Sequence, residues 1–117
     1  MSSASDCLFC KIRDGQIPSQ PVHKDELCFA FRDLNPQAPM HVLVAPRRHI
    51  ATLNDLGEAD EALVGHLFTV AAKLARDEGH AESGWRAVFN VNRGAGQAVF
   101  HIHLHVLGGR PLGWPPG

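Results

Sequence analysis

Residues 99–109 read VFHIHLHVLGG, and this run constrains the fold more strongly than any other part of the chain. Strict alternation of histidine with apolar residues predicts a β-strand that has one apolar face. Side chains on a strand alternate between its faces, so the three histidines share one face, roughly 6.5–7 Å from one to the next. The two alternating sets are His101, His103 and His105, and Ile102, Leu104 and Val106. A sheet built from this strand therefore presents three imidazoles side by side.

The rest of the hydrophobic pattern predicts an antiparallel sheet with one long helix. Alternation and short apolar runs predict strands over residues 22–24, 26–32, 41–46 and 85–91, in addition to 99–107. A long helix is predicted over residues 58–78, because apolar residues recur at helical spacing, acidic residues crowd the start and Gly79 follows the end. A short N-terminal helix is predicted over residues 6–14. About five strands joined by links of hairpin length indicate an antiparallel α+β domain.

Length and charge narrow the class of protein. The chain of 117 residues predicts one domain, residues 1–117, with a C-terminal tail over residues 108–117. Its net charge of −1 provides no attraction to nucleic acid or to an anionic membrane, so we expect neither as a partner. The first residues carry no export signal, and three cysteines in such a chain predict a cytoplasmic protein with reduced thiols.

Three histidines on one strand face allow three interpretations. A purely structural, solvent-facing surface is the weakest, because Thr or Lys would be its usual occupants. Imidazole is a common zinc ligand, and alternating histidines on a strand can chelate a metal ion. Histidine also serves as nucleophile and acid in group transfer near neutral pH, because its unperturbed pKa is about 6.5. The residues themselves leave the last two interpretations open.

The histidine run resembles the signature of the histidine triad family, in which three histidines alternate with apolar residues. The resemblance extends over FRDLNPQAPMHVLVAPRRHI, and the tail GGRPLGWPPG is similar to that of the nucleotide-binding Hint branch. It implies the family's α+β fold (HIT-like), a homodimer and a purine nucleotide hydrolase or transferase. Such an enzyme cleaves nucleoside phosphoramidates or acyl-adenylates through a nucleotidyl-histidine intermediate. It releases a nucleoside monophosphate and requires no catalytic metal.

The family match assigns catalytic positions to four histidines. His103 matches the nucleophile that attacks the α-phosphorus. His105 matches the position that contacts the phosphoryl oxygens and the leaving-group side. His41 matches the further active-site histidine, and His101 is expected to orient the site or to bind metal.

The match also assigns nucleotide-binding residues. Asp33 and Leu34 match the pair that contacts ribose, although by itself Asp33 reads better as a turn residue. Phosphate contacts fall on the glycine loop, where the sequence alone predicts only a hairpin turn. The full set at the phosphate is Asn90, Gly96, Gln97, Ala98, His103 and His105. Ala98 stands where the Hint branch usually has serine. The base pocket would be lined by Phe31, Leu43 and Ile17, each of which is otherwise a core residue.

Cys7 and Cys10 have the C-x₂-C spacing of half a zinc site. A second cysteine pair does not exist, because Cys28 lies alone in a predicted strand and reads as a small core residue. The resemblance to bacterial members of the family completes the metal set as Cys7, Cys10, His49 and His101. Two thiolates and two imidazoles form a closed shell, so the zinc would be structural. The alternative is that these thiols bind no metal.

The sequence leaves open the roles of three histidines and of the tail, and it allows other functions. His23, His66 and His80 match no family position and are expected on the surface. The tail is expected to be disordered, or else to hold Trp114 as an anchor near a partner's active site. The alternative to an enzyme is a nucleotide-binding or scaffolding protein with vestigial hydrolysis. A metal-storage protein or metalloenzyme would explain the thiols but not the glycine loop or Asp33.

Overall fold

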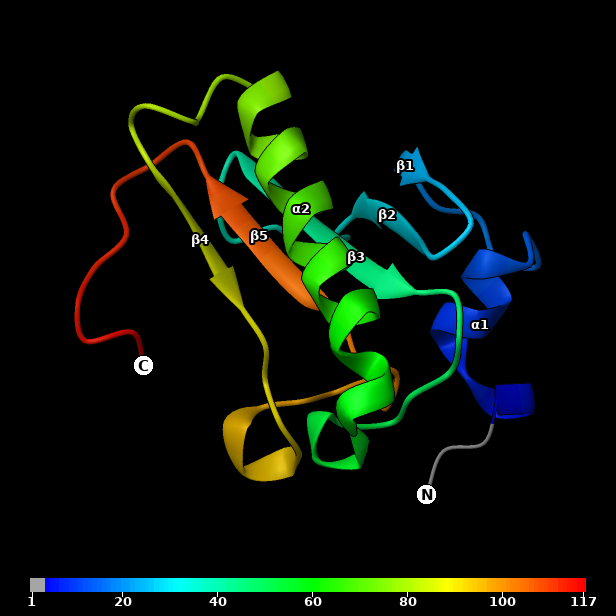
Figure 1. Ribbon diagram of the computed structural model, residues 1–117. Coiled ribbons are helices and arrows are strands. Elements are labelled where there is room, and N and C mark those ends of the chain that lie inside the picture. The colour runs from blue at the N-terminus through cyan, green and yellow to red at the C-terminus, as the bar shows by residue number, and fades with distance from the viewer. Residues whose placement is uncertain (1–3) are drawn as a thin grey trace.

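A five-stranded antiparallel sheet forms the centre of the structure, a computed structural model that describes residues 4–117. The first three residues of the predicted domain 1–117 lie outside the described part. The strands lie in the order β1-β2-β3-β5-β4 (Figure 1). Their bounds are β1 (Pro21–Lys24), β2 (Cys28–Arg32), β3 (Met40–Pro46), β4 (Trp85–Val88) and β5 (Leu104–Gly108). The predicted α+β class with about five strands is confirmed.

Two helices cover opposite faces of this sheet. Ala30 of β2 belongs to the apolar cluster under α2 (Glu61–Asp77), whereas its neighbours Phe29 and Phe31 belong to the cluster under α1 (Leu8–Arg13). Adjacent strand residues point to opposite faces, so α1 and α2 lie on opposite sides of the sheet. The short 3₁₀ helices are η1 (Ala4–Asp6), η2 (Leu53–Asp55), η3 (Glu58–Asp60) and η4 (Arg93–Ala95).

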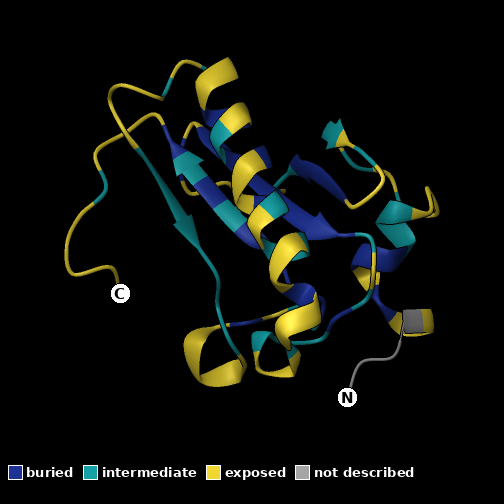
Figure 2. Ribbon diagram, viewed as in Figure 1, coloured by how far each residue is buried: buried dark blue, intermediate teal, exposed yellow. Residues whose placement is uncertain are grey.

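The central strand β3 is buried along its whole length. Val42 and Val44 pack with Leu104 and Val106 beneath α2, and Leu43 packs in the other cluster. Figure 2 shows this contrast: β3 is coloured as buried, while one side of α2 is exposed along most of its length. A strand covered on both faces carries nearly continuous apolar residues, which is why HVLVAP reads as a run rather than an alternation.

Helix α2 begins three residues later than the sequence predicts. Residues 58–60 form the 3₁₀ turn η3, in which the Asp60 carboxylate accepts the Gly57 N–H at 2.9 Å and pairs with Arg48. At the other end, Gly79 has a φ of +88° and His80 N–H donates to Ala75 O at 2.8 Å, which caps the last turn. Among residues 4–117, neither helix has the length and apolar content needed to cross a membrane.

The strand that carries the histidines is shorter than predicted. β5 pairs with β3 only from Leu104, opposite Val44, so His101 and His103 precede the strand. The chain before β5 instead follows the segment after β3, where Ile102 N–H donates to Ile50 O at 2.8 Å. The predicted strand over residues 85–91 also ends early, at the last residue of β4, before the irregular glycine loop.

Candidate functional site

The structure separates the three histidines of the HIHLH run into two sites. His103 and His105 lie together, with their ring centroids 5.0 Å apart, and His105 meets His41 from β3. His101 points elsewhere, toward Cys10 and the other residues of a buried cluster. The predicted grouping of His103 with His105 and His41 is present, and His101 is placed with the predicted metal ligands.

Hydrogen bonds determine which nitrogen of His41 and His105 carries a proton. Gln37 N–H donates to His41 Nδ1 at 3.0 Å, so Nδ1 is an acceptor and neutral His41 holds its proton on Nε2. His41 Nε2 lies 2.9 Å from His105 Nδ1 and 3.4 Å from Asp33 Oδ2. His105 Nδ1 therefore accepts, and the proton of neutral His105 lies on Nε2.

His103 is oriented by the backbone two residues before it. Its Nδ1 lies 2.8 Å from His101 O, and a carbonyl only accepts, so Nδ1 carries the proton. The lone pair of neutral His103 is then on Nε2. The ring of Phe9 packs edge-on against this imidazole, with centroids 4.8 Å apart. A fixed tautomer and a fixed ring leave one nitrogen available as a nucleophile.

Burial keeps these imidazoles neutral. It lowers the pKa of His103, against the opposing effect of its bond to His101 O. It lowers the pKa of His105 to about 4, helped by the neighbouring His103 and His41. It also lowers the pKa of His41, although Asp33 acts in the opposite direction. Neutral imidazole is the nucleophilic form, so the site is suited to attack at neutral pH.

The two predicted ribose residues lie beside His41. A pocket of about 290 Å³ is lined by Gln20, Arg32, Asp33, Leu34, Pro36, Pro39 and His41. Asp33 also has the turn role that its sequence context predicts, because its Oδ1 accepts Asn35 N–H at 2.8 Å. Leu34 is 91% exposed, so its side chain is available to a ligand.

The predicted base-pocket residues do not all line one space. Ile17 and Phe31 line a pocket of about 350 Å³ between α1 and β2. Leu43 does not line that pocket; it is buried in the cluster that also holds Phe9 and Phe31.

The glycine loop is held together by its own hydrogen bonds. Gly96 lies in the left-handed region with a φ of +91°, and the N–H groups of Gly96 and Gln97 donate to Arg93 O and Asn92 O. The Gln97 side chain accepts Asn92 N–H and donates to Ala51 O and Val99 O, at 2.7, 2.7 and 3.0 Å. These groups build the turn. Ala98 is exposed, and half-buried Asn90 lies between β4 and the loop.

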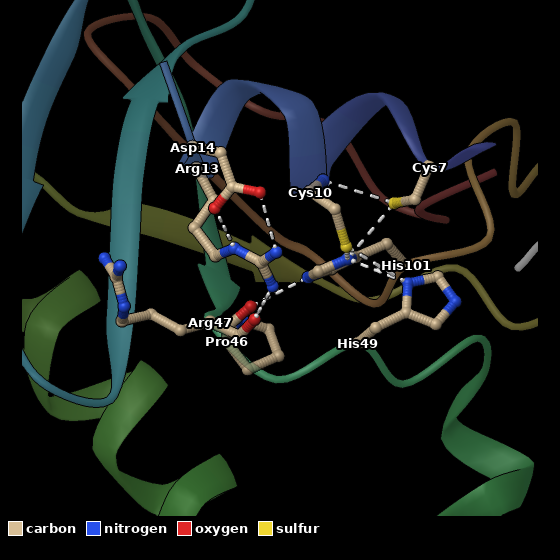
Figure 3. A network of polar contacts seen from close by, with 8 residues as sticks. All are labelled: Cys7, Cys10, Arg13, Asp14, Pro46, Arg47, His49 and His101. Carbon is tan, nitrogen blue, oxygen red and sulfur yellow. Dashed lines mark hydrogen bonds and ion pairs between the residues drawn. The ribbon is translucent and has the colours of Figure 1, made fainter. Parts of the chain in front are cut away.

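The four predicted metal ligands converge (Figure 3). His101 Nδ1 lies 3.3 Å from Cys7 Sγ, 3.5 Å from Cys10 Sγ and 3.3 Å from His49 Nδ1, and Cys10 Sγ lies 3.5 Å from His49 Nδ1. A tetrahedral zinc with ordinary Zn–N and Zn–S bonds separates its ligand atoms by about 3.3–3.8 Å. The donor atoms therefore fit a zinc ion.

The surroundings of His101 support this fit. Its Nε2 donates to Pro46 O at 2.7 Å, so its Nδ1 lone pair is directed into the cluster, as in metal sites where a carbonyl fixes the ligand tautomer. Cys7 and Cys10 are almost completely buried, and Cys7 Sγ accepts Cys10 N–H at the start of α1. Burial, and then Cys7, raises the pKa of Cys10 to about 11.

His23 and His66, which are expected on the surface, are only partly exposed and share one carboxylate. Both are half-buried, and each Nε2 lies 2.7 Å from Asp25 Oδ2, which ties β1 to α2. Burial alone would raise the pKa of Asp25, but hydrogen bonds from His23, His66 and the N–H groups of Leu27 and Cys28 hold it well below its usual range. The sequence gives no periodic signal for this cluster. His80 is also half-buried, beside Gly108 and Gly109.

The C-terminal tail runs beside β4 (Figure 1). Arg86 Nη2 donates to Gly113 O at 2.8 Å, and Arg110 Nε donates to Gln37 O at 2.8 Å. Trp114 is 83% exposed. The tail is therefore tied to the domain by polar contacts, while the indole of Trp114 remains uncovered in the single chain.

Comparisons with known proteins agree with this geometry. The HIT domain matches residues 14–112. The chain is 51% identical over 110 residues to the purine nucleoside phosphoramidase of Escherichia coli K12, covering 94% of this chain and 92% of that protein. A HIT family hydrolase from Legionella pneumophila has a TM-score of 0.93 at 55% identity, over 95% of this chain and 99% of that one. A zinc-bound histidine triad family protein from Mycobacterium smegmatis has a TM-score of 0.79 at 30% identity, over 98% and 82%. The chain therefore belongs to the histidine triad (HIT) family.

Proposed function

We propose that this protein is a purine nucleoside phosphoramidase, which hydrolyses nucleoside phosphoramidates or acyl-adenylates to a nucleoside monophosphate. The observation that carries the proposal is the His103 tautomer: its Nδ1–H is bound by His101 O, which leaves the Nε2 lone pair for attack. The similarity to the Escherichia coli phosphoramidase supports the same reaction class.

The proposed reaction has two displacements at phosphorus. His103 Nε2 forms a bond to the α-phosphorus while the bond from phosphorus to the leaving amine or acyl oxygen breaks. The departing amine takes up a proton from solvent water, and neutral His105 donates a hydrogen bond to its nitrogen through Nε2–H, because His41 occupies the Nδ1 of His105. Water then attacks the phosphorus, the bond to His103 breaks, and the proton that the attacking water loses neutralises the hydroxide left by the first step. This route has no step that requires a metal ion at the phosphate.

Nucleotide binding is proposed at the residues that the family match assigns. Asp33 would accept hydrogen bonds from the ribose hydroxyls beside Leu34, in the pocket that also contains His41. Phosphate would lie near His103 and His105, with Asn90 and the loop residues Gly96, Gln97 and Ala98 around it. Because the N–H groups of Gly96 and Gln97 close the loop, we assign the phosphate-facing N–H to Ala98.

Zinc is proposed at Cys7, Cys10, His49 and His101. The spacing of the donor atoms and the burial of the thiols support a closed tetrahedral shell. When bound, such an ion supplies structural stability rather than an open coordination position for substrate. We expect one equivalent per chain, measurable by metal analysis of protein purified without chelator.

A cytoplasmic homodimer is proposed as the working form. Phe68 on α2 is 43% exposed and packs edge-on against half-buried Phe89, with ring centroids 6.0 Å apart, so a partly exposed aromatic pair joins the helix to the residue after β4. Pairing of two copies across a two-fold axis would cover it. Light scattering at micromolar concentration should give twice the mass of one chain, and a monomer would contradict the proposal.

Intact-protein mass spectrometry tests the proposed function most directly. Brief mixing with an adenosine phosphoramidate should add the mass of one nucleotidyl group to the wild-type chain and nothing to His103→Ala. Hydrolysis without this adduct in any time window would contradict the covalent route. Tight nucleotide binding with no hydrolysis would instead favour the binding or scaffolding function.

A further inference from the structure

We infer that the Cys7, Cys10, His49 and His101 cluster positions the nucleophile, so that metal at this site sets the orientation of His103. The inference rests on the proposed function, and it concerns how this chain couples two sites that share the HIHLH run. The four ligands are then positioning residues: they act on the reaction only through His103.

His101 connects the two sites directly, because its three polar groups have three separate partners. Its Nδ1 faces Cys7, Cys10 and His49, and its Nε2 donates to Pro46 O. Its backbone carbonyl accepts the Nδ1–H of His103 at 2.8 Å. A ring held at both nitrogens fixes the residue that carries this carbonyl. A shift of His101 would therefore move the acceptor that selects the nucleophilic tautomer.

Helix α1 provides a second connection. Phe9 lies between the two cysteines and packs edge-on against His103 at 4.8 Å and against Phe31 at 5.3 Å. Within four consecutive residues, Cys7 and Cys10 are thus proposed metal ligands and Phe9 contacts the nucleophile. Figure 3 shows the thiols of Cys7, at the N-cap of this short helix, and of Cys10, within the helix, directed at the His101 ring. If the thiols were released, Phe9 would lose the anchors on either side of it.

The backbone around His103 makes this dependence stronger. The paired register of β3 and β5 ends at Leu104, so residues 101–103 lie beyond it. This segment is held instead by the bond from Ile102 N–H to Ile50 O and by the side chain of His101, which contacts the metal cluster and Pro46 O. Misplacing a reacting group by about 1 Å can reduce a rate about a hundredfold.

The inference predicts a split between rate and binding. Loss of metal should lower kcat for a nucleoside phosphoramidate by about tenfold to a hundredfold, as for other changes that disturb groups around a metal site. The affinity for AMP should change by less than about threefold, because Asp33 and Leu34 lie outside the cluster. A purely stabilising metal would leave kcat of the folded fraction unchanged.

The test compares Cys10→Ser with Cys28→Ser. Cys10→Ser removes one ligand but keeps Cys7 as the N-cap of α1. Cys28 is equally buried and lies outside the cluster, so Cys28→Ser is the matched control. For both variants we would measure zinc content, kcat and AMP affinity, together with the imidazole ¹⁵N resonances of His103. We expect Cys10→Ser to lose zinc and to show a mixture of His103 tautomers, whereas Cys28→Ser keeps zinc and the Nδ1–H form.

Several outcomes would overturn the inference. One is that the wild-type protein contains no zinc. Another is that Cys10→Ser folds without zinc and still keeps the wild-type kcat and the Nδ1–H tautomer of His103. If Cys10→Ser does not fold, the same resonances are followed in wild type during chelation and zinc return. Global unfolding on chelation would show a general structural role and also overturn it. If zinc controls the tautomer but no substrate is hydrolysed, the proposed function fails while the coupling stands.

Discussion

His41 Nε2 lies 2.9 Å from His105 Nδ1, and Gln37 N–H occupies the other nitrogen of His41 at 3.0 Å. The two bonds run in one direction, from a backbone donor through His41 to His105. As a result, the proton of neutral His105 lies on Nε2, the nitrogen that faces away from His41. His41 therefore orients a hydrogen-bond donor rather than attacking phosphorus itself.

The first prediction follows from this pair. His41→Ala should lower kcat for a phosphoramidate by about tenfold to a hundredfold, because His105 loses the partner that selects its tautomer, and one hydrogen bond to the developing charge can contribute that much. KM should change by less than about threefold. Steady-state kinetics would check this, with His80→Gln as a control for removing a half-buried histidine elsewhere. Equal kcat in wild type and His41→Ala would remove the orienting role.

The second prediction concerns the nucleophile. His103→Ala should abolish turnover while AMP still binds, because a covalent route has no substitute for the Nε2 lone pair at this position. Calorimetry with AMP and single-turnover kinetics would measure the two properties separately. A variant that retains most of the wild-type rate would show that His103 is not the nucleophile.

Sequence patterns predicted the sheet, its strand number and the long helix because these depend on residue periodicity. The alternation in the HIHLH run and the apolar run of β3 both follow from which side chains are buried, and the spacing of buried side chains is visible in the sequence. The pattern failed at the beginning of β5, since residues 101–103 keep the alternation without pairing to β3. There, the ring of His101 is held by the cysteine cluster rather than by a strand ladder.

The direction of the hydrogen bonds at the active-site histidines could not be predicted from the sequence. The tautomer of His103 depends on a carbonyl two residues away, and that of His41 on a backbone N–H in a loop. The partnership of His23 and His66 with Asp25 joins positions 41 residues apart through one carboxylate oxygen, which no local pattern encodes. Family resemblance assigned the site residues, whereas their protonation requires three-dimensional geometry.

The third prediction concerns acid stability. Asp25→Asn should lower the free energy of unfolding at pH 7 by about 2–4 kcal/mol, because the carboxylate accepts bonds from His23, His66 and two backbone N–H groups. The folded pKa of Asp25 is depressed, so its contribution is present above the unfolded pKa of about 3.9 and is lost as pH falls below it. Denaturation of both proteins from pH 7 to pH 2 should show the difference shrinking below about pH 4.

A matched control for this titration is Asp77→Asn. Asp77 pairs with exposed Lys73 at 3.3 Å on α2, and such a pair contributes little. A stability difference between wild type and Asp25→Asn that stays constant down to pH 2 would contradict the assigned role of the carboxylate charge.

The fourth prediction concerns the tail. Deleting residues 114–117 should change relative kcat/KM values among phosphoramidates with different leaving amines more than it changes stability. Trp114 is 83% exposed, so its removal costs the single domain little, while Arg86 still holds Gly113. In the proposed dimer, the indole would lie near the partner's leaving group. Unchanged substrate preference in a dimer that has lost Trp114 would contradict this.

The last prediction concerns Ala98, where the Hint branch usually has serine. Ala98 is exposed beside the histidine segment, and a hydroxyl there would add one donor for a phosphoryl oxygen or the leaving atom. The Gln97 amide cannot replace it, because Asn92, Ala51 and Val99 already engage that side chain. A hydrogen bond to a charged group contributes about 1.5–3 kcal/mol, and water recovers part of that in the alanine protein.

Ala98→Ser should therefore raise kcat/KM for a phosphoramidate by about threefold to a hundredfold. AMP affinity should rise less, because a hydroxyl that acts on the leaving atom contributes in the transition state and not to the product. Ala95→Ser, an exposed position of the same loop, is the matched control and should leave both values unchanged. An unchanged or lower kcat/KM in folded Ala98→Ser would mean that the site has adapted to alanine, with water as the donor and no room for a hydroxyl.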